Sequence, residues 1–217
     1  MKYDPAQVRV HEAYTVAIRD LGVHGEGIGS VDGFTVFVHG ALPGETVTAK
    51  ITLLKKSYAL GKLLSVEQES PFRMVPECPV YENCGGCQLS HLTYEGQLDM
   101  KYRRVKDVIE RIAGESGDLV RPVLPAAHPF AYRNKMAVPA GLVKGKAALG
   151  CYRQGTHDII PVSSCAIQKE ENNRLLQFAR RFIEKYGISV YDEKTQKGSL
   201  RHVMGRVGDD GKVMVVL

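Results

Sequence analysis

Five short runs of alternating apolar and polar residues, punctuated by glycine and proline, occupy the first third of the chain and constrain its fold most. They are Val8–Val10, Tyr14–Ile18, Phe34–Val38, Val47–Leu53 and Leu60–Val66. Alternation over so few residues is typical of strands with one buried face. Short strands joined by tight turns predict a small closed barrel over residues 8–68. The glycine-rich stretch 21–29 is expected to be a strand-turn-strand corner of this barrel.

Basic and aromatic residues toward one end of this barrel make it a candidate RNA-binding module. These residues are Lys50, Lys55, Lys56, Tyr58 and Lys62. Small barrels bind single-stranded nucleic acid with cationic side chains and stacking aromatics, and a solvated surface is the alternative. The whole chain carries a formal charge of +5, with the excess after Pro71, which is compatible with a polyanionic partner.

Three of the five cysteines lie close together in the sequence, in the run Cys78-Pro-Val-Tyr-Glu-Asn-Cys84-Gly-Gly-Cys87. Clustered thiols in a chain without a secretion signal point to a metal or redox site rather than to disulfides. A fourth ligand must come from a distance, and Cys151 and Cys165 are both available. Three close thiolates with one remote partner favour an iron–sulfur cluster, with zinc as the alternative.

The remainder of the chain predicts an α+β domain with helices on an antiparallel sheet. Apolar residues repeat at helical spacing between residues 92 and 114 and again between 167 and 186. Strands are expected at 132–138, 147–153 and 158–162, followed by a hairpin around Asp209-Asp-Gly211. Candidate RNA contacts here are Arg133, Lys135, Arg153 and His157, with structural hydrogen bonding as the alternative for each.

Two segments carry a resemblance to known families. Residues 8–68 resemble a TRAM domain, an RNA-binding barrel, through Leu21-Gly22, Gly27-Ile-Gly29, Phe37-Val38, the ALPGE segment at 41–45 and the segment 55–61. The pattern Pro76-x-Cys78-x5-Cys84-Gly-Gly-Cys87-x-Leu-x-His91, with Cys165-x-Ile-Gln168 downstream, is similar to the cluster motif of RNA uracil-5-methyltransferases. The resemblance implies a [4Fe–4S] cluster held by Cys78, Cys84, Cys87 and Cys165, with Cys151 as a packing thiol.

The resemblance also implies a partner and a reaction. Family members transfer a methyl group from S-adenosylmethionine to C5 of uridine, and the TRAM-plus-cluster combination favours 23S rRNA. In that family the catalytic residues and the cofactor loop belong to a C-terminal Rossmann-like domain. No glycine-rich cofactor loop is evident in this chain, which stops within the apolar run 213–217.

We therefore expect an all-β OB-like (TRAM) barrel at 8–68, a cysteine cluster segment at 69–91 and a truncated α+β central domain at 92–217. The Rossmann-like catalytic domain is expected to be absent, so that the chain holds no catalytic or S-adenosylmethionine-binding residues and is inactive alone. A stand-alone, non-catalytic RNA-binding iron–sulfur or zinc protein is the alternative. With 44% apolar and 24% charged residues and no membrane-length apolar run, the chain is expected to be a cytoplasmic monomer.

Overall fold

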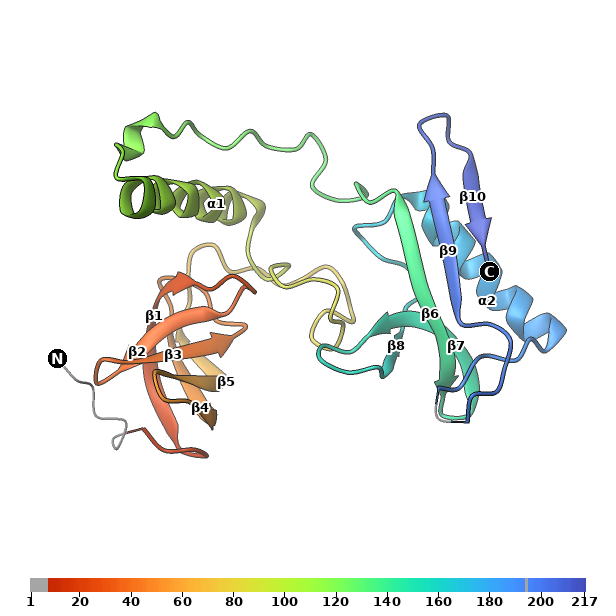
Figure 1. Cartoon of the computed structure of the whole chain (residues 1–217), viewed down its shortest axis with the longest axis horizontal. Coiled ribbons are helices and arrows are strands. Elements are labelled where there is room, and N and C mark those ends of the chain that lie inside the picture. Colours follow the sequence, from red (N-terminus) through yellow and green to blue (C-terminus); the bar gives the residue numbers. More distant parts are fainter. Residues whose placement is uncertain (1–7, 194) are drawn as a thin grey trace. The chain divides into compact units, whose positions relative to one another are not determined.

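The computed structural model describes residues 8–193 and 195–217, and the chain divides into two compact units (Figure 1). The first unit contains residues up to 75 together with 88–125, and the second contains 76–87 together with 126–217. The segment expected to be continuous over 69–91 is thus shared between the units. The helical region that the sequence placed with the central domain groups with the barrel.

The first unit is built on a closed five-stranded barrel, which confirms that part of the expected fold. Around the barrel the strands follow the order β1-β2-β3-β5-β4, with β3 and β5 parallel and the other pairs antiparallel. The strands are β1 (Ala13–Leu21), β2 (Gly27–Val31), β3 (Phe34–His39), β4 (Thr46–Leu54) and β5 (Tyr58–Gln68). Alternating residues such as Val16, Val36 and Val47 are fully buried in its core.

One strand differs from the expectation. Val8–Val10 forms no strand, whereas the glycine-rich stretch supplies β2. A Cβ at Gly29 would collide with the Val16 side chain and the Ala17 carbonyl of β1, so only glycine allows these strands to approach so closely. Gly29 lowers strand propensity, yet its missing side chain is what allows β2 to pair closely with β1.

A buried carboxylate ties the barrel to the segment that follows it. Glu45 is almost fully buried, and its Oε2 accepts hydrogen bonds from the Arg73 guanidinium and the Leu42 N–H, each at 2.8 Å. Arg73 also donates to the Gly40 carbonyl. Burial alone raises the pKa of Glu45, but the hydrogen bonds from Arg73, Leu42 and Ser70 outweigh it and lower the pKa.

Helix α1 (Tyr94–Val108) starts at the Thr93 cap and continues into a π-helical turn at Ile109–Ala113, followed by a 3-10 turn at Gly117–Leu119. This confirms the predicted helix. The helical spacing suggested that the apolar stripe is buried. In the structure, Gly96 is the one buried residue of α1. Val105 is 50% exposed and Ile112 is 80% exposed.

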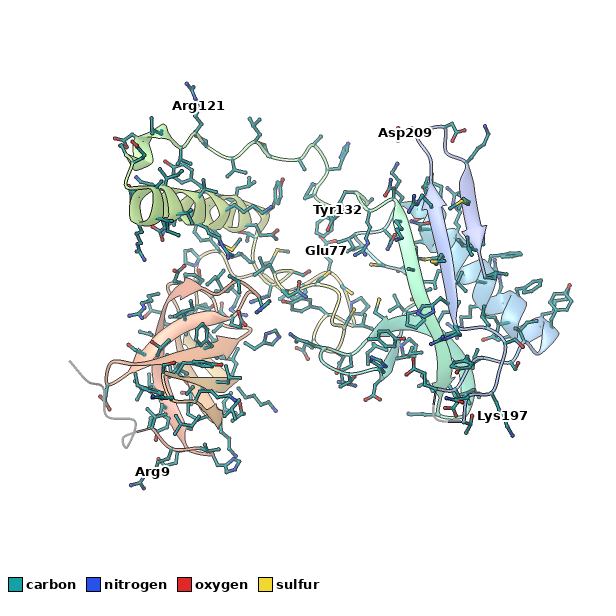
Figure 2. All side chains as sticks on the ribbon, viewed as in Figure 1. Arg9, Glu77, Arg121, Tyr132, Lys197 and Asp209 are labelled. Atoms are coloured by element: carbon teal, nitrogen blue, oxygen red, sulfur yellow. The ribbon has the colours of Figure 1, made fainter. Side chains whose placement is uncertain are left out.

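The second unit is an antiparallel sheet with one helix packed on it. The sheet order is β10-β9-β6-β7-β8, formed by β6 (Lys135–Val143), β7 (Lys146–Tyr152), β8 (Ile159–Pro161), β9 (His202–Val207) and β10 (Val213–Val216). Helix α2 (Glu170–Tyr186) lies across one face (Figure 1), where Leu176, Ala179 and Ile183 pack with Met136 and Val203. Asp209 marks the β9–β10 turn (Figure 2). No helix in the described part of the chain has the length and apolar character needed to cross a membrane.

We predict that the first unit loses stability in mild acid because of His91. Burial, with the nearby Arg73 charge, lowers the pKa of His91 to about 4. Between pH 6.5 and 4 the unfolded chain binds a proton that the folded chain does not, so stability falls with falling pH by up to about 3 kcal/mol. Urea unfolding at several pH values measures this slope. His91→Gln is expected to flatten it, and His24→Gln, at an exposed histidine of the same unit, is expected to keep it. An unchanged slope in His91→Gln would contradict the assignment.

Candidate functional site

All five cysteines belong to the second unit and line one cavity of about 690 Å³. Cys78, Cys84 and Cys87 come from the loop 76–87, Cys151 from β7, and Cys165 from the turn before α2. Each is half-buried and none forms a disulfide. The structure therefore brings to one cavity the thiols that the sequence singled out.

The loop 76–87 is held against the end of β7 by backbone pairing. The Gly85 N–H donates to the Tyr152 carbonyl at 2.9 Å, and Cys84 forms a β-bridge with Arg153. A Cβ at Gly85 would lie 3.0 Å from the Gln154 Cα, so a larger residue would push the loop away. The Arg153 guanidinium donates to the Asn83 Oδ1 at 2.7 Å. Arg153 thus has the structural hydrogen bond that the sequence left as an alternative to RNA contact.

Two asparagines at the start of α2 position the opposite wall. The Asn173 side chain accepts from the Cys165 N–H at 2.9 Å and donates to the Cys165 carbonyl at 3.3 Å. Asn172, which is fully buried, donates to the Asn134 carbonyl at 3.1 Å and to Gln168 at 2.9 Å. Together, the two asparagines connect the start of α2 to the turn at Cys165 and to Asn134, the residue before β6. The sequence reasoning missed both residues, whose only signal is a pair of amides in a helical first turn.

The thiols suit a soft metal centre in number and type. Four thiolates are the usual ligands of an iron–sulfur cluster or a structural zinc ion. The Gly86 N–H points at the Cys84 Sγ at 3.4 Å. Burial, with the nearby Cys84 thiol next in effect, raises the pKa of Cys151 to about 12, which favours its neutral form. Across residues 8–193 and 195–217, no three His, Cys, Asp or Glu side chains already stand close enough to hold a metal ion. The residue types are those that hold such a centre, whereas their described positions do not form one.

The sheet face opposite α2 carries basic residues. Met136 and Val203 pack under α2, so strand alternation places Lys135 and Arg206 on the other face. Lys135 and Arg206 are direct cross-strand neighbours and both are exposed. Arg133 precedes them, with its Nε donating to the Lys135 carbonyl at 3.2 Å. Arg206 was not among the sequence candidates, and only the strand register shows that it stands beside Lys135.

The barrel candidates occupy two places along the β4–β5 hairpin. Lys55 and Lys56 lie in its turn, whereas Lys50 lies within β4, opposite Lys62 of β5. Like charges facing each other across strands are unfavourable unless an anion screens them. None of these four lysines forms an ion pair with a carboxylate in the described part of the chain. Tyr58 packs edge-to-face against Phe37, with ring centroids 5.5 Å apart.

Comparison with known proteins identifies the barrel and the relatives of the chain. Residues 7–64 match the TRAM domain family. A Bacillus cereus protein named as an uncharacterized RNA methyltransferase is 50% identical over 96% of this chain, and one from Clostridium tetani is 42% identical over 97%. The structure of Pyrococcus abyssi tRNA (uracil-54, C5)-methyltransferase in complex with S-adenosyl-L-homocysteine matches 93% of this chain with a TM-score of 0.69 and 25% identity.

The matches also show how much of each relative this chain covers. The chain spans about half the length of the curated relatives it matches, 46% of each of the two named above, and 44% of the Pyrococcus abyssi chain. The chain contains a TRAM domain, and its homologues are RNA methyltransferases.

Two expectations from the sequence are corrected by these findings. The expected fold class stated that a Rossmann-like catalytic domain is absent, and the expected function was that of an N-terminal part, inactive alone. The chain aligns over nearly all of its residues with proteins named as methyltransferases, including one solved with S-adenosyl-L-homocysteine. This alignment overturns both expectations. The error has a plain cause. Both expectations relied on the point where the given sequence stops and on a motif not found within it. Neither observation tests the fold or the activity, because the chain spans only about half the length of its relatives.

We predict that the Asn173 amide stabilises the cysteine cavity. Asn173→Ala removes both hydrogen bonds to Cys165 and leaves the Cys165 N–H without its acceptor, whereas the Cys165 carbonyl still accepts from the Gln168 N–H; the cost is about 2 kcal/mol to the free energy of unfolding. Urea denaturation followed by circular dichroism measures the change. Gln177→Ala, at an exposed position of the same helix, is the control and is expected to lie within about 0.5 kcal/mol of the wild type. Equal stability of the two variants would contradict the proposed clamp.

Proposed function

We propose that this protein is an S-adenosylmethionine-dependent methyltransferase that modifies C5 of a uridine in RNA. The observation that carries the proposal is the match of 93% of the chain to a structure described as a tRNA (uracil-54, C5)-methyltransferase in complex with S-adenosyl-L-homocysteine. The TRAM domain and the RNA methyltransferase relatives support the same substrate class. The described residues contribute RNA binding and a metal centre to this activity.

RNA binding is assigned to two surfaces, each within one unit. On the barrel, Lys50, Lys55 and Lys56 offer cations without carboxylate partners among the described residues, and Tyr58 offers a ring. On the second unit, Lys135 and Arg206 stand side by side on the open sheet face. Arg133 and His157 complete this second group, whereas the guanidinium of Arg153 is engaged by Asn83.

The RNA class is proposed as 23S rRNA, on the combination of a TRAM barrel with a cysteine cluster. The solved neighbour named for a tRNA makes tRNA the competing substrate. The test is tritium release from 5-tritiated uridine in 23S rRNA and tRNA transcripts, using the full-length protein and S-adenosylmethionine. Release from rRNA is expected, with a severalfold higher KM and unchanged kcat for the double variant Lys55→Ala, Lys56→Ala. Release from tRNA alone would reassign the substrate, and no release from either RNA would overturn the proposed activity.

We also propose that Cys78, Cys84, Cys87 and Cys165 hold a [4Fe–4S] cluster. A cluster bound there would supply a covalent link between the loop 76–87 and the turn before α2. The hydrogen bonds of Gly85 and Asn173 already orient these two segments toward the cavity. Cys151, on the core side of β7, is proposed to remain a protonated packing thiol.

Iron and sulfide analysis after anaerobic purification tests this assignment. The wild type is expected to be brown and to hold four irons per chain. Cys165→Ser is expected to lose most of the iron, and Cys151→Ser, the matched control on the same cavity, is expected to keep it. If Cys151→Ser loses the iron and Cys165→Ser keeps it, Cys151 is the fourth ligand instead. A colourless protein with one zinc ion per chain would exclude the cluster.

A further inference from the structure

A second cavity lies on the open face of the sheet in the second unit. It has a volume of about 320 Å³, near the lower end of the range of about 300–1,000 Å³ for ligand pockets. Its floor includes Gly141 of β6 and Tyr152 of β7, and its rim comes from loop residues around His157, Tyr191, Glu193 and Arg201. The cavity is therefore lined by residues from four segments of the sequence, and none of them belongs to α2.

Flat side chains line the cavity in two stacked pairs. The rings of Tyr152 and His157 are stacked, with centroids 5.1 Å apart and planes 24° apart. The Arg201 guanidinium lies over the Tyr191 ring, 4.6 Å from its centroid. Unstacked bases of single-stranded RNA bind to such aromatic rings and guanidinium planes.

Three acidic residues line the cavity, Asp158, Asp192 and Glu193, and Glu193 contacts a member of each stacked pair. Glu193 Oε2 lies 3.0 Å from His157 Nδ1, and Oε1 lies 3.9 Å from an Arg201 nitrogen. The hydrogen bond to His157, with smaller effects of the His157 and Arg201 charges, lowers the pKa of Glu193. An ionised carboxylate only accepts hydrogen bonds, and its two oxygens have lone pairs beyond those used by these neighbours. A ligand that binds the Glu193 carboxylate must therefore donate hydrogen bonds to it.

We propose that this cavity binds an unpaired guanine base of the RNA substrate, with the guanine N1–H and N2 amino group donating to Glu193. Among the four RNA bases, guanine alone presents two adjacent N–H donors on its Watson–Crick edge, which match the two oxygens of a carboxylate. The ring of the base stacks on the flat side chains beside it. The inference rests on the proposed function for its choice of RNA as ligand, and it adds a base preference that the proposed activity does not contain.

Fluorescence anisotropy with the full chain and labelled oligouridylates tests this preference. The oligonucleotides carry guanosine, inosine or adenosine at one central position, and inosine lacks only the N2 amino group. The wild type is expected to bind the guanosine oligonucleotide about tenfold more tightly than the other two. Glu193→Gln is expected to remove this difference. Glu184→Gln is the matched control, because Glu184 is an exposed carboxylate paired with Arg180 on α2, and it is expected to keep the difference.

The outcomes separate this proposal from the proposed function. Equal wild-type affinities for the three oligonucleotides, or a preference that survives Glu193→Gln, would overturn the guanine site while leaving RNA binding intact. No binding of any oligonucleotide or of the RNA transcripts would overturn both. Tyr191→Leu gives an independent check should Glu193→Gln not fold. Loss of a stacking surface is expected to weaken binding of the guanosine oligonucleotide severalfold, and unchanged binding would count against the site.

Discussion

The pairing of residues 76–87 with the end of β7 is the constraint on which the second unit depends. This loop belongs to the linker in sequence, yet the Gly85–Tyr152 hydrogen bond and the Arg153–Asn83 hydrogen bond add it to the sheet. Without that pairing, three of the five thiols would leave the cavity, and its remaining wall would hold only Cys151 and Cys165. The close approach at Gly85 shows that the arrangement tolerates little change in side-chain size.

The two units use buried polar groups in a similar way. In the first, the Glu45 carboxylate accepts hydrogen bonds from Arg73 and from the backbone N–H groups of Leu42 and Ser70. In the second, Asn172 and Asn173 bind the Asn134 and Cys165 carbonyls and the Cys165 N–H. Both arrangements supply an acceptor for a backbone N–H group, that of Leu42 in the first unit and that of Cys165 in the second. In the second unit, these hydrogen bonds fix the turn that carries the candidate ligand Cys165 to the start of α2.

Much of the fold was predictable from the sequence, because alternation and helical spacing report directly on which residues are buried. The barrel and both helices follow from these patterns. The sequence predicted a strand-turn-strand corner over 21–29 but did not count β2 among the five strands, because Gly29 lowers strand propensity while meeting a steric need that only the three-dimensional packing shows. The stripe on α1 predicted a helix correctly, but periodicity does not say how completely a partner covers it. The thiols could be singled out because their chemistry is rare, whereas Tyr191, Glu193 and Arg201 are ordinary residues that only the fold assembles.

The interleaving of the two units has a consequence for how the chain is made. Synthesis delivers Cys78, Cys84 and Cys87 first, then the whole of α1, and only afterwards the strand and turn that carry Cys151 and Cys165. At bacterial and eukaryotic rates of translation, the early thiols wait on the order of ten seconds for their partners. During that interval the residues that complete the cavity around them have not yet been made. Assembly of the cavity is therefore tied to the timing of translation as well as to the final packing.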